Sequence, residues 1–375
     1  MALNVVSSDR LSTNVKTSNL ATDLSAVVGT RKNLLYNGSM EIAQRGTSFA
    51  SIGSPGTYHL DRWRSTFTLA TGRYTASQDS SGPAGFAKSL KIDVTTAEAS
   101  LGASSAAGCV QMLEGQDLQQ LQKGTATAKS VTLSFWVKST TTGTYVVELQ
   151  DSQNNRILCK QYTISAANTW EKKTLTFAGD TTGALTADNA GRLYVQFFLA
   201  AGTNYTSGTL GANWAASVAA NRMVGQTNLF SSTDNDWYVT GIQLEVGDTA
   251  TEFEHTSYGD ELLRCLRYCW VQGKDQTYTN FAEGTITSST GWEGIVHMPV
   301  PMRAKPTTTF AGTTRVWDAS SATNTSATGT DSGSGGKDVV RMTATCSGAS
   351  FNIGRSALFG ASNDATASVT HSAEL

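Results

Sequence analysis

The stretch WYVTGIQLEVGDTATEFEHTSYGDELLRCLRYCW, residues 237–270, joins a strand pattern to a helix pattern through a turn. Every second residue of Tyr238–Val246 belongs to one face of the strand pattern, and that face is mostly apolar. This period of two is typical of a half-buried β-strand. Gly247 and Asp248 then provide the residues of a turn. We therefore predict that the last strand of a β domain lies here.

A helix pattern follows the turn. Ser257 and, three residues later, Asp260 form a helix-start signal. The apolar residues after it recur at the spacing of one helix face: Leu262, Cys265, Leu266 and Cys269. We therefore expect a linker helix within residues 255–271, which connects two β domains.

The composition restricts the class of protein. The chain has 375 residues, of which 15% are charged, and its net charge is -2. This balance gives no electrostatic footprint for nucleic acid or for an anionic membrane surface. The sequence contains no run of ~18 apolar residues, so it predicts no membrane-spanning helix. Its N-terminus also lacks the pattern of a secretory signal peptide. The 5 cysteines, an odd number, suit free thiols in a protein made in a reducing cytosol.

Alternating strand patterns recur through residues 33–254, with short breaks rich in Gly and Ser. They include 63–69, 90–94, 131–137, 145–149 and 193–199. Two such sheets can cover each other's apolar faces across a core ~10 Å thick. We therefore predict an all-β chain whose main domain, residues 33–254, is an antiparallel jelly-roll sandwich.

The strand pattern lapses between Asn204 and Asn228, where small residues surround Trp214 and Arg222. An insertion of this length is expected to form a surface loop. Long loops on such a scaffold are often functional. The alternative is that this loop makes a contact between subunits.

Residues 1–32 form a polar segment that precedes the first strand. Its isolated apolar residues recur about every four positions: Leu11, Val15, Leu20, Leu24 and Val27. This spacing fits an arm with helical stretches that buries one side against a partner. A disordered leader fits the composition equally well, because so few apolar residues cannot form a core alone.

The last part of the chain, residues 272–375, has few aliphatic side chains for its length. Thr307–Val316 and Val339–Thr345 are expected strands, whereas Ala319–Lys337 is rich in Ser, Thr and Gly and is expected to be a flexible loop. A unit of this composition would bury little apolar surface as a monomer. We therefore expect a small C-terminal β domain that completes its core as a homotrimer.

Three aromatic residues lie on the polar faces of the predicted strands: Trp136, Tyr194 and Phe198. Their polar neighbours are Lys138, Glu148, Arg192 and Gln196. Aromatic rings stack on the apolar side of sugars, and flanking amides and charges bind the hydroxyls. If the strands share a sheet, these residues form a carbohydrate-binding platform. The alternative is that a loop, the arm or a neighbouring subunit covers the rings.

Catalytic and metal-binding patterns are weak in this sequence. Its 4 histidines are scattered, and neither a nucleophile elbow nor a phosphate-binding loop is found. Asp61, or Glu252 with Glu254, would be the candidates for glycan cleavage by paired carboxylates, but the latter pair follows a strand end and is expected to be solvated. Cys265 and Cys269 lack further metal ligands nearby, so we expect them on the buried face of the linker helix. We expect no enzymatic activity.

Several stretches carry a resemblance to a known class of protein. They are NLLYNGSMEIAQRG (33–46), YHLDRW (58–63), LEVGDTATEFEHTSYGDELLRCLRY (244–268), VPMRAKP (300–306) and AEL (373–375). Together they resemble tail-fibre and other virion-surface proteins of tailed bacteriophages. The first stretch is also similar to the first strand of jelly-roll carbohydrate-binding modules. Such modules often hold a structural calcium ion, for which Glu41 and Asp236 would be the oxygen donors; the alternative is two ordinary carboxylates near turns.

The resemblance implies a tail fibre with a definite order of parts. Residues 1–32 would attach to virion proteins of the tail or capsid, and residues 272–375 would form the distal, trimerising end. The partner would be a glycan or protein of the host surface, with no binding to nucleic acid and no membrane insertion. Such a protein is made in the host cytoplasm and works on the virion. The alternative is a capsid-decorating fibre or knob with a purely structural role.

Overall fold

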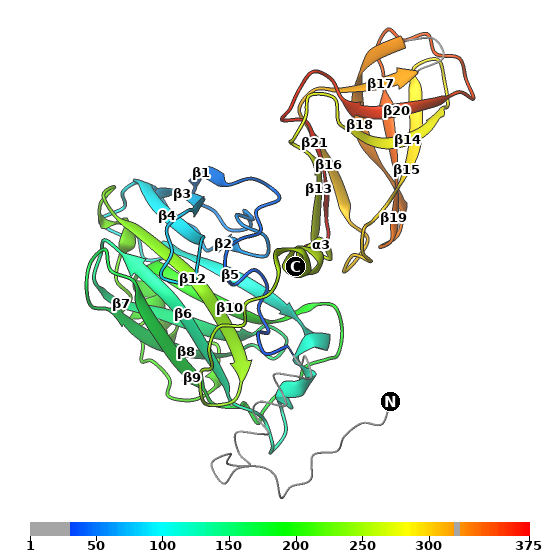
Figure 1. Cartoon of the computed structure of the whole chain (residues 1–375). Helices are drawn as coiled ribbons and strands as arrows, with labels where there is room; N and C mark the ends of the chain where they lie inside the picture. Colours follow the sequence, from blue (N-terminus) through cyan, green and yellow to red (C-terminus); the bar gives the residue numbers. More distant parts are fainter. Residues whose placement is uncertain (1–30, 319–322) are drawn as a thin grey trace, which may run out of the picture.

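The computed structural model describes residues 31–318 and 323–375, so residues 1–30 of the expected arm lie outside the described residues. Figure 1 shows a large sandwich of two sheets and a smaller barrel, with one short helix and a three-stranded sheet between them. All sheets are antiparallel, which confirms the predicted all-β class. No helix among the described residues is long and apolar enough to cross a membrane.

The sandwich consists of two six-stranded sheets, here called sheet A and sheet B. Sheet A has the order β1 (Ser48–Ile52), β3 (Arg73–Asp79), β4 (Ser89–Thr96), β12 (Asp236–Val246), β6 (Val131–Ser139) and β9 (Glu171–Phe177). Sheet B has the order β11 (Ala215–Ala216), β8 (Arg156–Ile164), β7 (Gly143–Asp151), β10 (Gly191–Ala201), β5 (Ala106–Glu114) and β2 (Arg64–Thr66). Between β4 and β12 the chain passes repeatedly from one sheet to the other, which gives the jelly-roll topology. The predicted jelly-roll sandwich is therefore confirmed.

Aromatic side chains fill the space between the two sheets. Phe135 from sheet A and Phe197 from sheet B meet edge to face, with ring centroids 5.0 Å apart. Trp63 and Trp237 contact the ring of Phe197 with centroid distances of 6.1 and 6.0 Å, and all four side chains are fully buried. Edge-to-face pairs of this kind add to the stabilisation that comes from burial alone.

Strand β12 contains an irregularity that the sequence pattern did not predict. Its pairing with β6 shifts between Thr240 and Gln243, and Gly241 in this β-bulge has a φ of +60°. Trp237 before the bulge and Ile242 after it both face the core, so the alternation changes phase at Gly241. The expected uniform face over Tyr238–Val246 is therefore wrong: the side chain of Tyr238 lies on the outer face of sheet A.

The segment after β10 covers the outer face of sheet B. It contains α2 (Thr203–Thr206), strand β11 and the short 3-10 helix η3 (Ala219–Asn221); η4 (Leu229–Ser231) follows it and packs Leu229 and Phe230 into the main core. Beneath it lies a small apolar cluster that includes Phe198 from β10 and Met223 from the segment, both fully buried. The expected surface loop at 204–228 thus packs its apolar residues onto the sandwich, and we call residues 203–228 the cover segment.

Helix α3 (Tyr258–Leu266) follows the sandwich and begins where the sequence predicted it. The Asp260 N–H donates to the Ser257 hydroxyl at 3.2 Å, which caps the helix. Cys265 lies on the buried side of α3, but Cys269 is the first residue of the next strand, so the expected shared helix face of the two cysteines is wrong. The helix ends at Leu266, and Tyr268 two residues later is fully buried in the sandwich core.

The C-terminal part comprises a small sheet and a closed barrel. The small sheet has the order β13 (Cys269–Gly273), β21 (Ser368–Ser372) and β16 (Thr307–Ala311). The barrel has the order β14 (Asn280–Ile286), β15 (Gly291–His297), β19 (Val339–Thr345), β18 (Thr323–Gly335), β17 (Thr314–Asp318) and β20 (Ser356–Ala361). Closure of the six strands satisfies the edges of the sheet within one chain.

Strand β18 occupies most of the range that was expected to be a flexible loop, so that expectation is wrong. The strand pairs with β17 on one side and β19 on the other and thereby closes the barrel. Its small residues fit this place: a Cβ at Gly329 would lie 2.5 Å from Phe310 and 2.8 Å from Phe359. At Gly329, therefore, the neighbouring aromatic rings leave no room for a larger side chain.

The barrel has a core of its own. Trp292 stacks on Phe359 with centroids 5.3 Å apart, and Phe281, Val316 and Met342 are buried around them. The expectation that this unit would bury little by itself is wrong, because aromatic and methionine side chains replace the scarce aliphatic ones. The homotrimer, which rested partly on that expectation, stays a prediction.

A buried polar network connects the barrel to the sandwich. The guanidinium of Arg62, which is 1% exposed, donates to the Met112 carbonyl at 2.6 Å, pairs with the Glu374 carboxylate, and lies 3.5 Å from the Tyr268 ring centroid. Arg45 donates to the same carboxylate at 3.0 Å. Charge-assisted bonds of this kind are stronger than bonds between neutral groups, so they hold Glu374 against the sandwich.

Further contacts extend this junction on both sides. Arg267 binds Glu114 through two bonds of 2.9 and 2.7 Å, and the Tyr268 hydroxyl donates to Glu114 at 2.5 Å. Arg303 donates to the carbonyls of Ala373 and Glu374 at 2.7 and 2.9 Å. The five stretches that carry the resemblance to phage proteins, far apart in sequence, therefore meet at this junction.

Candidate functional site

The residues predicted for a carbohydrate platform lie on two different sheets. Trp136 and Lys138 belong to β6 in sheet A. The other five, Glu148, Arg192, Tyr194, Gln196 and Phe198, belong to β7 and β10 in sheet B. The expected single platform is therefore wrong, because the jelly-roll topology sends consecutive strands into opposite sheets.

The sheet B residues are mostly bound within the protein. Phe198 is fully buried, and its ring lies 5.6 Å from that of Phe67 and 5.9 Å from the guanidinium of Arg222. Arg222 binds the Glu148 carboxylate through two nitrogens, the bond from Nε being 2.8 Å long. Gln196 donates at 2.8 Å to Glu148 Oε1, which also accepts from Arg222 Nη2. The alternative in which a loop covers these residues is the arrangement observed.

The remaining two sheet B residues lie at the start of β10. Arg192 forms an ion pair with Asp188 in the preceding loop, and Tyr194 is half-buried. Neither contacts Trp136 or Lys138, whose strand lies on the opposite side of the sandwich. The structure thus leaves Trp136 and Lys138 as the members of the predicted set that face outward from sheet A.

Two further aromatic residues join them on that face. The Lys138 ammonium lies 4.0 Å from the ring centroid of Tyr238 and 5.2 Å from that of Trp170. The two rings are edge to face at 6.2 Å. Lys91 on β4 pairs in register with Tyr238 and lies 5.6 Å from its ring. These contacts form a row of side chains across three neighbouring strands and the residue before β9.

Trp136 lies one step along the strands from this row. It pairs in register with Thr240 on one side and with the exposed Lys172 on the other. Its indole is half-buried, and a Cβ at Gly241 would be 3.1 Å from it. Together these residues define the sheet A face: Lys91, Trp136, Lys138, Trp170, Lys172, Asp236 and Tyr238.

An acidic residue stands at the end of the sheet A face. The Tyr238 hydroxyl donates to Asp236 Oδ2 at 2.9 Å, and Lys91 Nζ lies 3.7 Å from the same oxygen. Burial and the neighbouring Asp236 carboxylate raise the pKa of Tyr238 to about 12. The phenol therefore remains protonated and available as a hydrogen-bond donor at all ordinary pH values.

The two expected calcium donors contact different neighbours. Asp236 interacts with Lys91 and Tyr238, whereas the backbone carbonyl of Glu41 accepts from Gln78 on β3 at 3.0 Å. Among residues 31–318 and 323–375, no group of three or more His, Cys, Asp or Glu side chains could hold a metal ion.

The carboxylates considered for glycan cleavage have separate structural surroundings. Asp61 is buried and accepts from the backbone and side chain of Gln44 at 2.8 and 2.6 Å. Glu254 accepts from the backbone of Lys32 and Asn33 at 3.0 and 2.8 Å. The side chain of Glu252 is 99% exposed. Each carboxylate is accounted for by solvation or by bonds to the chain itself.

Sequence reasoning missed Tyr238 and Trp170. Tyr238 was assigned to an apolar face because the pattern of β12 was extended through Gly241. A glycine inside a strand often marks a bulge, so Gly241 was the available signal for the change of phase. Trp170 precedes β9 and falls outside any alternating pattern, and its place beside Lys138 follows from the pairing of β6 with β9.

Comparisons with known proteins give structural similarity alone. No family model and no curated protein matches the chain. The chain is similar to the enzymatically active domain of tailspike protein 4 of bacteriophage CBA120, with 17% identity, 57% of this chain and 21% of that chain covered, and a TM-score of 0.30. It is also similar to the CBM22-1 and GH10 modules of Clostridium thermocellum xylanase 10B, with 12% identity, coverages of 58% and 29%, and a TM-score of 0.30.

A third similarity is to the CBM22-1 xylan-binding domain of Paenibacillus barcinonensis Xyn10C. The identity is 12%, the coverages are 58% of this chain and 96% of that domain, and the TM-score is 0.27. The chain thus spans about a fifth of the tailspike domain and most of the isolated binding domain. TM-scores near 0.3 assign no family, so the function is argued from the residues of this chain.

Proposed function

We propose that this protein binds a glycan through the sheet A face and does so as a non-enzymatic surface fibre of a tailed-bacteriophage virion. The observation that carries the proposal is the arrangement of the partly exposed Trp136, Trp170 and Tyr238 beside lysines on the outer face of sheet A. On sheet B the cover segment buries Phe198, whereas Trp136, Lys138 and Tyr238 on sheet A stay partly exposed.

The side chains of this face have the chemistry of sugar recognition. Rings of Trp and Tyr stack on the apolar faces of pyranoses. The ammonium of Lys138 donates up to three hydrogen bonds and lies between two of the rings. Strands hold the rings in fixed positions, which lowers the entropic cost of binding.

The virion part of the proposal rests on the resemblance of five stretches to phage surface proteins. On this proposal residues 1–32 attach to tail or capsid proteins, three copies assemble, and the barrel lies at the distal end. The partner is a glycan of the host surface, and the protein acts outside the cell in which it is made. The proposal includes no catalytic step. Of the carboxylates considered for cleavage, two accept hydrogen bonds from the chain itself and one is exposed to solvent.

One observation favours the second candidate, a purely structural fibre or knob. The stretches that carry the resemblance contribute Arg45, Arg62, Arg267, Arg303 and Glu374 to the junction between sandwich and barrel. They contribute less to the sheet A face, whose Trp136, Lys138 and Trp170 lie outside them. The resemblance to phage surface proteins thus supports a shared scaffold more than a shared ligand.

Binding to a printed array of bacterial surface polysaccharides tests the proposal. We expect the full chain to bind a subset of the array, and the triple variant Trp136→Ala, Trp170→Ala, Tyr238→Ala to lose that binding. Tyr258→Ala, which removes an exposed ring of helix α3, is the matched control and should bind normally. Unchanged binding by a folded triple variant would refute the site. No binding by the wild type, together with no delay of phage adsorption to host cells, would favour the structural role.

A further inference from the structure

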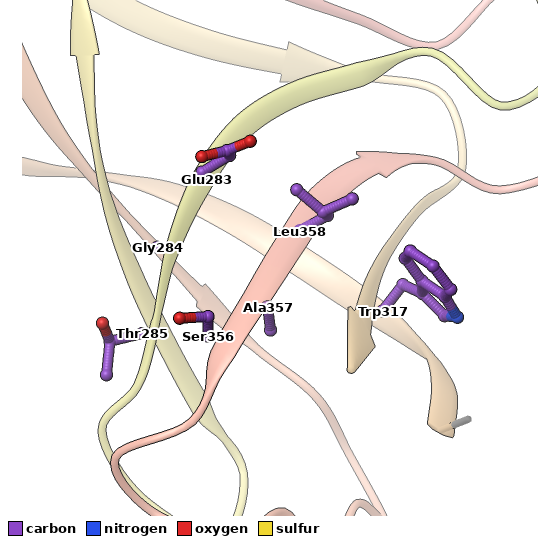
Figure 2. A pocket seen from close by; sticks show the side chains of 7 residues that line it. All are labelled: Glu283, Gly284, Thr285, Trp317, Ser356, Ala357 and Leu358. Carbon is purple, nitrogen blue, oxygen red and sulfur yellow. The ribbon is translucent and has the colours of Figure 1, made fainter. Parts of the chain in front are cut away.

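The outer wall of the barrel has a depression that is separate from the sheet A face. It has a volume of about 480 Å³ and lies over β14, β20 and β17. Figure 2 shows Trp317 at one side, Glu283 at the other and Leu358 between them, with Ser356 and Thr285 along the lower edge. This surface belongs to the unit that the proposed function places at the distal end of the fibre.

The spacing of the side chains follows from the register of the strands. Trp317 on β17 pairs with Leu358 on β20, and Leu358 pairs with Glu283 on β14. Neighbouring strands lie ~4.8 Å apart, so the Cα atoms of Trp317 and Glu283 are roughly 10 Å apart. That distance leaves room for one six-membered sugar ring above Leu358, between the indole and the carboxylate.

The floor of the depression is fixed by the barrel core beneath it. The Trp292 indole N–H donates to the Ala357 carbonyl at 2.9 Å, and the Trp292 ring stacks on Phe359. The two small residues of the floor, Gly284 and Ala357, are paired in register. The groups above this floor are therefore presented by strands that are already held in place, which favours binding without rearrangement.

The chemistry of the lining selects a class of ligand. Trp317 is 36% exposed, Glu283 is exposed, and the Glu283 carboxylate makes no hydrogen bond or ion pair with any described residue. The lining residues include this carboxylate and the hydroxyls of Thr285 and Ser356 but no cation. A carboxylate accepts hydrogen bonds from hydroxyl groups and repels a second negative charge.

We propose that this depression binds a neutral hexopyranose unit of a glycan, independently of the sheet A face. The apolar side of the sugar stacks on Trp317 and rests on Leu358, and two adjacent hydroxyls donate to Glu283. The two surfaces differ in charge, because the sheet A face carries Lys91, Lys138 and Lys172 whereas this lining is acidic. An acidic sugar is therefore excluded here but not at the sheet A face.

Saturation-transfer NMR on the full chain tests the inference with four probes: the methyl glycosides of glucose, galactose, mannose and glucuronic acid. We expect transfer to at least one neutral glycoside and none to the glucuronide at this site. Trp317→Ala should weaken binding of that neutral glycoside by about tenfold or more, and Glu283→Ala should weaken it as well. Ile353→Ala, which removes an exposed apolar side chain elsewhere on the barrel, should leave it unchanged.

The two proposed sites can be separated in the same experiment. The triple variant of the sheet A face should bind the neutral glycoside as the wild type does, and Trp317→Ala should leave the array binding of the sheet A face intact. Thermal unfolding shows whether each variant is folded, and only small changes are expected because the altered side chains are exposed or half-buried. The inference is overturned if the wild type binds none of the neutral glycosides, or if both Trp317→Ala and Glu283→Ala bind like the wild type.

Discussion

The outer faces of the two sheets carry similar residues but differ in how far these residues are buried. On sheet B, Phe198 and Glu148 are sealed beneath the cover segment by Met223 and Arg222. On sheet A, Trp136 and Tyr238 remain half-buried beside Lys138. The polar face of a strand is therefore buried where a connecting segment covers it and stays partly exposed where none does. Four substitutions measure this difference, in order of decreasing effect.

Phe198→Ala should destabilise the protein strongly, whereas Trp136→Ala should not. Phe198 is fully buried under the cover segment, and truncation of a buried Phe costs about 3–5 kcal/mol through lost contacts and the cavity. Trp136 is half-buried, so its removal costs much less. Urea unfolding of both variants measures the contrast. Equal losses of stability would show that the two faces are covered to the same extent.

Arg222→Ala should open the cover segment. It leaves the buried Glu148 carboxylate without its cation, and the breaking of a buried pair costs about 3 kcal/mol. Burial and the Glu148 charge raise the pKa of the Cys159 thiol well above its usual range, so this thiol stays protonated at pH 9. Alkylation of Cys159, which is 5% exposed, should therefore be slow in the wild type and faster in Arg222→Ala.

The matched control for this prediction is Arg192→Ala. Arg192 forms an ion pair with Asp188 at the surface of the same sheet, and surface pairs contribute little. Neither stability nor the alkylation rate should change measurably in this variant. If Arg192→Ala increases the rate as Arg222→Ala does, access to Cys159 is governed by something other than the cover segment.

Gly241→Ala should damage the sheet A face at moderate cost. A Cβ there would lie 2.7 Å from the Phe86 ring and 3.1 Å from Trp136, and the φ of +60° costs a residue with a Cβ about 1–2 kcal/mol. Gly247→Ala is the control, because Gly247 also has a positive φ but no neighbour within 4 Å of an added Cβ. A larger loss of stability and of array binding for Gly241→Ala would tie the bulge to the shape of the face.

Tyr238→Phe should have the smallest effect. It removes the hydrogen bond to Asp236, worth about 0.5–1 kcal/mol, and keeps the ring for stacking. Since the folded-state pKa of about 12 lies above the usual 10.0, the contribution of the phenol is complete below pH 10 and is lost as the pH rises through 12. Stability curves of wild type and variant should converge over that range. Curves that stay parallel would show that this hydroxyl is not bonded in solution.

Periodicity predicted the fold well because the core strands obey it. Phe135 and Val137 point inward and Trp136 and Lys138 outward, as the alternation of β6 requires. Composition predicted less: the Ser, Thr and Gly of β18 indicate a loop when read alone, but the closure of the barrel makes this segment a strand. Its neighbours in the barrel are distant in sequence, and no local pattern contains them.

The candidate site was only partly accessible from sequence for the same reason. Whether Trp136 and Phe198 share a sheet depends on the jelly-roll crossings, and whether a ring is covered depends on the cover segment, which follows β10 in the chain. The change of phase at Gly241, which moves Tyr238 to the outside, was signalled only by a glycine within a strand. These are non-local properties, so they emerged only from the three-dimensional arrangement.

The junction between sandwich and barrel also determines how the molecule responds to force. The barrel is entered through β13, which follows α3, and left through β21, which pairs with β13, after which Glu374 is held by Arg62 and Arg45. The C-terminal part is thus attached to the sandwich at both of its ends, so a pull on it is shared between two attachments. Two attachments side by side oppose bending at this junction more than a single covalent link would.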